Sequence, residues 1–289
     1  MGIDVPSMAL LSAAKSIGVD FSSTCMIGRQ NFAGDNLPAG LTRLFRTAGL
    51  GGDAAAFLKE NHFCEALFKL LGAKNVESLD VSDYQQATHL HDMNEPIPAN
   101  LHERYTCVHD GGTIEHVFNI SQALKNCLQM LQLGGHFIQV NEANNFMGHG
   151  FWQLSPEMIY RAMSPANGFE VRAVLLHEVV PGGSWHLAAD PDKVGDRVEL
   201  CNSRPTYVMT IAQRTAIKEI FATAPQQSDY VADWKGARRP RATITRRKQP
   251  LMRRLLGRLQ RIAMGPPPFN PRYYWRLTEE QVWRGDFDI

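Results

Sequence analysis

The chain has 289 residues, of which 44% are hydrophobic and 20% charged, an ordinary composition for a globular protein of one large or two small domains. No run of about 18 apolar residues occurs, and no basic segment followed by an apolar one opens the sequence, so neither a membrane span nor a secretion signal is expected. The net charge of +1 conceals an asymmetry, because thirteen of the 30 basic residues lie between Lys235 and Arg276, where no acidic residue occurs.

Helices and strands are predicted to alternate through the first 180 residues. Proline near a start, glycine at a stop and apolar residues at helical spacing indicate the helices. The predicted helices cover residues 6–18, 61–71, 120–133 and 155–163, and the predicted strands cover residues 23–27, 76–81, 87–90, 105–109, 136–140, 169–178 and 206–213. Residues 31–52 are rich in glycine, and irregular structure is expected there.

This alternation is typical of parallel strands joined by crossover helices. We therefore expect an α/β fold, a doubly wound Rossmann-like sheet of seven strands in three layers (α/β/α), with a basic C-terminal extension. No good helix is predicted between the last two strands, which suggests an antiparallel edge. The expected division is a main domain over residues 1–225 and the extension over residues 226–289.

Polar residues and glycines follow the predicted strands, at the sheet edge where open α/β sheets bind ligands. They are Gly28, Arg29, Gln30, Asp80, Asp92, Met93, Asp110, Gly111 and Asn141. An aspartate after the second strand can accept hydrogen bonds from ribose hydroxyls. An aspartate in a turn, followed by an apolar residue, can hold an adenine amino group and one ring face. The sequence therefore predicts an adenosine ligand.

The run from Val108 to Val117 resembles the fourth strand and the following turn of class I S-adenosylmethionine-dependent methyltransferases. The segment from Leu131 to Phe137 is similar to that family's entry to its fifth strand, and Asp80 and Asp92 match the ends of its second and third strands. The resemblance covers roughly residues 20–215. It implies that S-adenosylmethionine is the cofactor and is held by Gly28, Arg29, Gln30, Asp80, Asp92, Met93, Asp110 and Gly111.

The first motif departs from the family pattern of an acidic residue and a Gly-x-Gly turn. The segment from Cys25 to Phe32 keeps only Gly28 of that pattern. Arg29 or Gln30 would then contact the cofactor through side chains, and a relative that binds no cofactor is the alternative. The absence of Gly-x-Gly-x-x-Gly argues against a third interpretation, a nucleotide- or NAD-binding oxidoreductase.

Glu115, His116 and His149 are the catalytic candidates, because a carboxylate or imidazole near the cofactor could deprotonate an acceptor hydroxyl. The alternative is that the first two open the next helix and hold its turn. A run of polar and aromatic residues after the fifth strand predicts a loop that binds a small or saccharide-type acceptor. The candidate acceptor-binding residues are Asn141, Asn144, Asn145 and Trp152. The alternative is an ordered turn with a tryptophan in the core. His89, His91 and Asp92 lack further clustered ligands, so no metal site is predicted.

A basic amphipathic helix is predicted from Pro250 to Met264. Residues 235–264 could bind an anionic membrane surface or an acidic protein partner, or the helix could pack on the acidic body of the chain. Nucleic acid is disfavoured as a partner because no aromatic residue lies within residues 235–264.

The five cysteines are irregularly spaced and include no Cys-x-x-Cys, which indicates reduced thiols in a reducing compartment. A cytoplasmic protein is therefore expected, which the basic segment could attach to the inner face of the membrane. The leading function is methyl transfer from S-adenosylmethionine to a small or saccharide-type acceptor. The alternative is an inactive methyltransferase-like module that docks on a membrane or a protein assembly through its basic helix.

Overall fold

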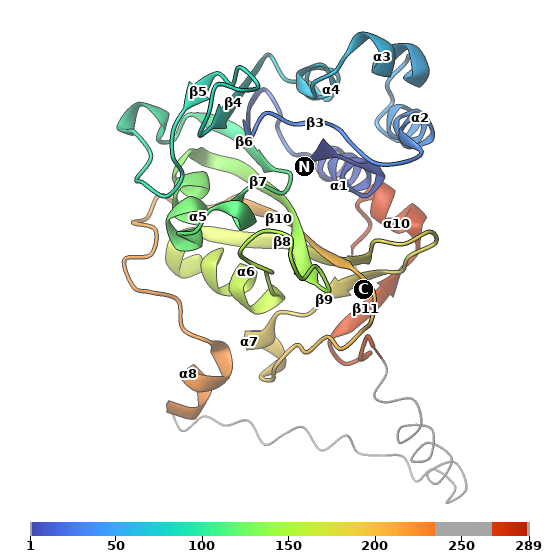
Figure 1. Cartoon of the computed structure of the whole chain (residues 1–289). Helices are drawn as coiled ribbons and strands as arrows, with labels where there is room; N and C mark the ends of the chain where they lie inside the picture. Colours follow the sequence, from blue (N-terminus) through green and yellow to red (C-terminus); the bar gives the residue numbers. More distant parts are fainter. Residues whose placement is uncertain (1, 235–267, 288–289) are drawn as a thin grey trace, which may run out of the picture.

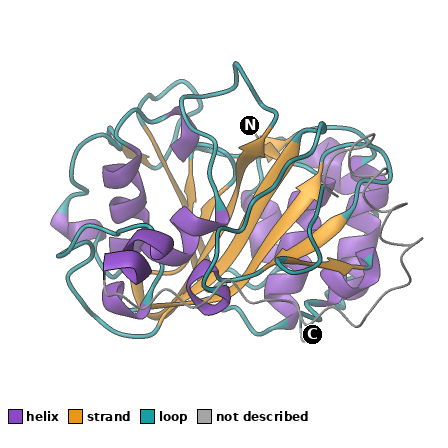
Figure 2. Cartoon of the chain, turned by 90° about the horizontal axis from the view of Figure 1, so that it is seen from below, coloured by secondary structure: helices purple, strands orange, loops and turns teal. Residues whose placement is uncertain are grey.

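A computed structural model describes residues 2–234 and 268–287 of the chain. Helices cover both faces of one large sheet, which gives the three layers visible in Figures 1 and 2. The predicted basic helix at residues 250–264 lies outside the described residues. In the described part of the chain, no helix is both long and apolar enough to cross a membrane.

Nine strands form the sheet, in the order β11-β9-β8-β10-β7-β6-β2-β4-β5. Their bounds are β2 (Ser23–Ile27), β4 (Asn75–Asp80), β5 (His89–Leu90), β6 (Tyr105–Asp110), β7 (Leu131–Asn144), β8 (Phe169–Glu178), β9 (Trp185–Ala188), β10 (Thr206–Arg214) and β11 (Tyr274–Leu277). The five strands from β5 to β7 are parallel, and β10 runs antiparallel between β7 and β8. The predicted Rossmann-like sheet of seven strands is confirmed, and β9 and β11 extend it on the antiparallel side.

The order in which the chain fills the sheet reverses between β2 and β6. From β2 the chain goes to β4 and β5 on one side, and it then returns to β6 and β7 on the other side. Open α/β sheets bind ligands beyond the carboxyl ends of their strands at such a switch point. The turns that follow β2 and β6 therefore mark the place to look for a site.

The helices form two hydrophobic clusters, one on each face of the sheet. One cluster contains residues of α1 (Val5–Ser16), α2 (Leu37–Thr47), α3 (Ala54–Glu60), α4 (Glu65–Leu70) and α10 (Glu279–Arg284). The other contains residues of α5 (Ile120–Gln129) and α6 (Pro156–Ala162). Two short strands, β1 (Gly2–Ile3) and β3 (Asn31–Phe32), pair with each other. Two short helices lie near α6, and they are α7 (Pro191–Val194) and α8 (Ser228–Trp234).

Helix α2 lies within residues 31–52, where irregular structure was expected. Its glycine misled the prediction, because Gly40 permits close packing against α1. A Cβ at Gly40 would lie 2.8 Å from Cγ2 of Val5, which is closer than side chains pack. The predicted helix over 120–133 was too long at its C-terminal end, because Leu131 pairs with Tyr105 as the first residue of β7.

The C-terminal segment is built into the body of the protein. Strand β11 pairs with β9, and α10 packs beside α1, so elements from near the two ends of the chain are in contact with the body (Figure 1). Trp283 of α10 is 1% exposed, and its carbonyl accepts a hydrogen bond of 2.8 Å from Oγ of Ser12. The predicted boundary at residue 225 is thus followed by elements that complete the sheet and one of its cores.

Replacement of this tryptophan tests how far the body depends on the C-terminal segment. We expect Trp283→Ala to lower the free energy of unfolding by about 3–5 kcal/mol, because it removes a large side chain from a closed core. Trp234→Ala is the matched control, since that side chain is 68% exposed, and it should change stability by less than about 0.5 kcal/mol. Urea denaturation at pH 7 measures both, and equal losses would contradict the packing described.

A buried carboxylate links three strands, β4, its neighbour β5, and β6 on the far side of β2. Glu77 of β4 accepts hydrogen bonds from the Tyr105 hydroxyl of β6 and from Nη2 of Arg104, both at 2.6 Å, and it lies 2.7 Å from Nε2 of His89 in β5. Burial alone would raise the pKa of Glu77, but hydrogen bonds from Tyr105, His89, Asn75 and Arg104 outweigh burial and lower it to about 2. The ionised form is therefore favoured by folding.

This shift predicts a stability contribution that depends on pH. Because the folded-state pKa of about 2 lies below the ordinary 4.5, the contribution is fully present above pH 4.5 and disappears as the pH falls toward 2. Glu77→Gln should lower the free energy of unfolding by about 2–3 kcal/mol at pH 7, and by much less at pH 3. A difference between variant and wild type that stays constant from pH 7 to pH 3 would exclude this role.

Candidate functional site

The turns after β2 and β6 meet at the switch point, but side chains fill the space between them. Gly28 has a φ of 70°, and a Cβ there would lie 2.6 Å from Oγ1 of Thr113. Gln30 is 2% exposed, and its Nε2 donates to the carbonyl of Ile27 at 2.9 Å. Its Oε1 has no hydrogen-bond partner among the described residues, and it would lie 2.7 Å from a Cβ added to Gly111. Both glycines thus permit contacts within the protein.

Arg29 braces the same edge of the sheet. Its Nε donates to Oε1 of Glu65 at 2.6 Å, and its Nη1 donates to the carbonyl of Gln85 at 2.7 Å. Its guanidinium also lies 3.9 Å from the ring centroid of Phe63. The side chain therefore links the turn after β2 to α4 and to the loop after β4, and it crosses the strand ends where a nucleoside was expected.

Asp80, Asp92 and Met93 have different surroundings. Among the described residues, Oδ1 of Asp80, at the end of β4, accepts one side-chain hydrogen bond, of 3.2 Å, from the backbone N–H of Ser82. Asp92 is exposed and closes its own turn by accepting two hydrogen bonds from Asn94, which lower its pKa. Met93 is 4% exposed and belongs to the core beneath α5. Among the described residues no hydrogen bond joins the two aspartates, and their role in binding stays a prediction.

A cluster of buried carboxylates lies at the carboxyl end of β6, beside the last residues of β7. Asp110 and Glu115 are both fully buried, and one amide links them. The Nδ2 of Asn141 donates to Oδ2 of Asp110 at 2.9 Å and to Oε2 of Glu115 at 2.7 Å. Asp110 also accepts the backbone N–H of Thr113 at 2.9 Å, which fixes the turn after β6. Asn141 was expected in a loop, but it lies inside β7 and its amide is occupied by these bonds.

Burial and mutual repulsion change the protonation of this cluster. Burial raises the pKa of Asp110 to about 6, although the hydrogen bond from Asn141 opposes the change. Burial and the nearby charge of Asp110 raise the pKa of Glu115 to about 10, and the carboxylate of Glu142 adds to the effect. Glu115 therefore keeps its proton at neutral pH, as expected where carboxylates share one buried site.

Glu142 is a member of the cluster that the sequence did not reveal. It is fully buried in β7, neither of its oxygens has a hydrogen-bond partner among the described residues, and Oε1 lies 3.2 Å from Nε2 of His149. The register of β7 against β10 shifts beside Glu142, between the partners of Thr206 and Tyr207. Such a bulge re-aims side chains, and no sequence pattern signalled it.

The loop before α6 brings His149 to Glu115. Backbone N–H groups of Phe151 and Trp152 donate to the Glu115 carbonyl at 2.8 and 3.3 Å. Gly150, with a φ of 64°, permits this approach, since a Cβ there would lie 2.9 Å from the same carbonyl. The rings of His116 and His149 then lie 4.9 Å apart, and burial and the charge of His149 lower the pKa of His116. The structure thus brings together the three predicted catalytic side chains.

The predicted acceptor residues divide into two groups. Asn144 and Asn145 donate to Asn202, and Asn145 also donates to the carbonyl of Arg204 at 2.8 Å, so they tie the end of β7 to another loop. Trp152 is 38% exposed and donates from Nε1 to the carbonyls of Val117 and Phe118. Two exposed aromatic side chains lie beside it, Phe118 and Phe151, whose rings contact each other. Trp152 therefore borders an exposed aromatic rim.

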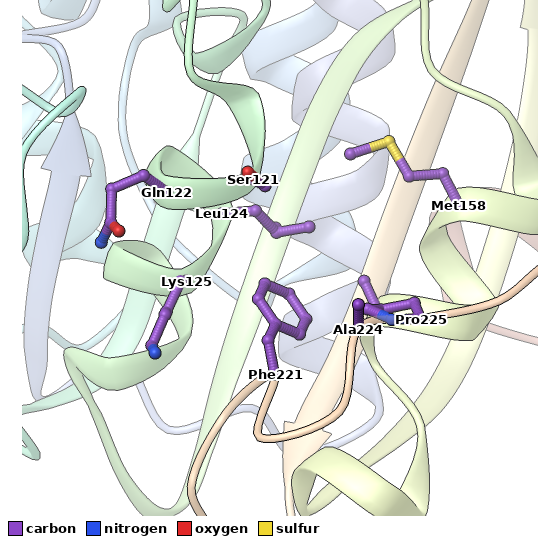
Figure 3. Close-up of a pocket in the computed structure, with 9 residues that line it drawn as sticks. Ser121, Gln122, Leu124, Lys125, Met158, Phe221, Ala224 and Pro225 are labelled. Carbon is purple, nitrogen blue, oxygen red and sulfur yellow. The ribbon is translucent and has the colours of Figure 1, made fainter.

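A separate groove lies on the face of the sheet covered by α5 and α6. Figure 3 shows it between Leu124 and Lys125 of α5, Met158 of α6, and the loop that contains Phe221 and Pro225. Its volume is about 310 Å³. None of the predicted site residues lines it, so the groove and the carboxylate cluster are distinct features.

Comparison with known proteins gives similarity to solved structures only. No family model matches the sequence, and no curated protein matches it. A Bacillus halodurans protein, provisionally assigned as a methyltransferase, is 12% identical, with 71% of this chain and 99% of that chain covered and a TM-score of 0.38. The 1,6-didemethyltoxoflavin-N1-methyltransferase of Burkholderia thailandensis, with bound S-adenosylhomocysteine, is 13% identical, with 72% and 78% covered and a TM-score of 0.35. A branched-chain polyamine synthase of Thermus thermophilus, with bound 5'-methylthioadenosine, is 12% identical, with 78% and 61% covered and a TM-score of 0.37.

The shared amide of Asn141 can be tested by an isosteric change. Asn141→Asp removes the donor that both carboxylates use and adds a third acceptor, so we expect the free energy of unfolding at pH 7 to fall by about 2–4 kcal/mol. Asn145→Asp is the control, because its amide bonds lie on an exposed loop, and it should cost less than about 1 kcal/mol. Comparable losses from chemical denaturation would show that Asn141 does not hold the cluster together.

Proposed function

We propose that the chain transfers a methyl group from S-adenosylmethionine to a hydroxyl of a small or saccharide-type acceptor. The observation that supports this most is the position of the carboxylate and imidazole cluster. It lies at the carboxyl end of β6 and beside the last residues of β7, near the switch point of a Rossmann-like sheet, where such folds bind nucleotide-like ligands.

The residues around the switch point have donors and acceptors that suit the cofactor. Asp80, which accepts one backbone hydrogen bond, would accept from the ribose hydroxyls. The buried Oε1 of Gln30, which has no partner among the described residues, would accept from the ammonium group of the methionine part. In this proposal Gln30 takes the place of the missing Gly-x-Gly turn, and the cofactor lies over its side chain.

S-Adenosylmethionine supplies an electrophilic methyl group on a positively charged sulfur. The acceptor oxygen forms the new C–O bond with a lone pair, the electron pair of the C–S bond stays on sulfur, and the hydroxyl proton leaves. His116 or His149 would accept that proton, since both imidazoles lie at the mouth of the cluster. The fixed loop beside Glu115 would hold the acceptor in line, which is most of what this reaction requires.

The rim around Trp152 supports an acceptor with an apolar or sugar-like face. Phe118 and Phe151 pack edge to face with ring centroids 5.6 Å apart, and they are 70% and 65% exposed. Exposed aromatic rings beside polar groups are suited to the apolar faces and hydroxyls of such molecules. The alternative function, an inactive module that docks through its basic helix, depends on residues outside the described parts, and no described contact favours it.

Calorimetric titration with S-adenosylhomocysteine tests the cofactor. We expect one equivalent to bind, and Asp80→Asn to weaken binding by about 10- to 100-fold through loss of a charged acceptor. Asp83→Asn is the matched control, because the exposed Asp83 lies in the same loop and carries the same charge. No heat with S-adenosylhomocysteine, together with binding of NAD, would replace this proposal with an oxidoreductase. No binding of either ligand would support the inactive module.

A further inference from the structure

We propose that Glu115, His116 and His149, with Glu142 as a fourth donor, form a binding site for a divalent transition-metal ion. One donor atom from each of the first three residues lies within 4.8 Å of the others. They come from the turn after β6 and the loop before α6, and Glu142 comes from β7 (Figure 1). Nothing in the sequence pattern suggested this set, because Glu142 was not recognised and the two histidines are 33 positions apart.

Buried acceptors without donors point into this space. Glu115 is fully buried; its Oε2 accepts from Asn141, while its Oε1 has no hydrogen-bond partner among the described residues. Glu142 is also fully buried, and both of its oxygens lack such partners. Oε1 of Glu115 lies 3.8 Å from Nε2 of His116, and Oε1 of Glu142 lies 3.2 Å from Nε2 of His149. One free oxygen of each glutamate thus lies within 4 Å of an imidazole nitrogen, as donors to one ion would.

The charge of the cluster lacks a permanent positive partner. Asp110, Glu115 and Glu142 are buried together, and within residues 2–234 and 268–287 no ion pair joins any of them to lysine or arginine. Burying several carboxylates together is costly, and without a cation Glu115 offsets part of that cost by keeping its proton. A bound ion would displace this proton and take over the compensation. His116 and His149 are the ion-pair partners of Glu115 and Glu142 among the described residues, and imidazole is also a metal ligand.

The backbone already places the donors for binding. Gly150 allows the loop to approach the Glu115 carbonyl, and the N–H groups of Phe151 and Trp152 hold it there, so His149 is fixed beside Glu115. Metal bonds of about 2.0–2.2 Å put the donors of one tetrahedral ion roughly 3.4 Å apart. The present separations need to close by little more than about 1 Å, which rotation of the half-exposed His116 side chain can supply. Asn141, bonded to Glu115, would orient that ligand from behind.

The donor set determines the kind of ion. Two imidazole nitrogens with two carboxylates suit Zn²⁺, Mn²⁺ or Fe²⁺, whereas Mg²⁺ and Ca²⁺ prefer oxygen ligands alone. An ion there would face the aromatic rim and could coordinate the acceptor hydroxyl, which would lower the pKa of that hydroxyl. With both imidazoles bound to the ion, the hydroxyl proton would pass to solvent water and not to His116 or His149. This use of the ion rests on the proposed methyl transfer, but the binding site itself does not.

Metal binding is measured on the full chain, purified without a histidine tag and stripped with a chelator. Titration calorimetry with Zn²⁺ should show one equivalent bound, and His149→Ala and Glu115→Gln should each weaken it by about 100-fold or more. His62→Ala is the matched control, because that histidine is exposed and outside the cluster, and it should bind like wild type. Equal affinity in wild type and His149→Ala, or no stoichiometric binding by the folded wild type, would overturn the proposal.

A measurement on the wild type covers the case in which the variants do not fold. Co²⁺ bound at this site should show the strong visible absorption of a four- or five-coordinate ion, and excess Mg²⁺ should not displace it. A spectrum like that of hydrated Co²⁺ would contradict the site. S-Adenosylhomocysteine is titrated into the same stripped protein, so failure of the cofactor proposal is distinguished from failure of the metal proposal.

Discussion

The amide of Asn141 is the interaction on which the candidate site depends. It joins Asp110, which caps the turn after β6, to Glu115, which begins the next segment, and it does so from within β7. Two parallel strands and the turn between them are thereby held in one arrangement. Because the three carboxylates nearby are buried, negative charge on any of them has to be compensated by a bound proton, an amide hydrogen-bond donor or a cation.

The switch point between β2 and β6 shows a different solution from an open, glycine-lined crevice. Gln30 and Thr113 pack between the two turns, and Arg29 ties the outer edge to Glu65 and Gln85. A cofactor in this protein would therefore contact side chains where backbone would otherwise approach it. Where a Gly-x-Gly turn would leave space free, the side chains of Gln30 and Arg29 occupy it in this chain.

The C-terminal segment, residues 268–287, is part of the folded body of the protein. Tyr274 and Trp283 are nearly fully buried, and the strand and helix that carry them complete the sheet and one of its cores. The folded body therefore includes elements from both sides of residues 235–264 in the sequence, namely α8 before them and β11 and α10 after them.

The sequence by itself determined the layered architecture, because alternating periodicity and glycine stops depend on local spacing. Strands β2 and β8 have the predicted bounds, and Ser155 caps α6 as predicted. It also placed Glu115, His116 and His149 among the functional candidates. What it could not supply were contacts between distant segments. Gly40 was interpreted as a loop signal because its neighbour in α1 is far away in the chain.

Only the tertiary structure decided which polar residues meet. A bulge in β7 brings Glu142 to His149, and a glycine in the loop before α6 brings His149 to Glu115. Asp92, which local spacing made equivalent to Asp80, instead closes its own turn in solvent. Spacing along a strand can identify the end at which a ligand binds, but burial and side-chain partners are set by elements that come from elsewhere in the sequence.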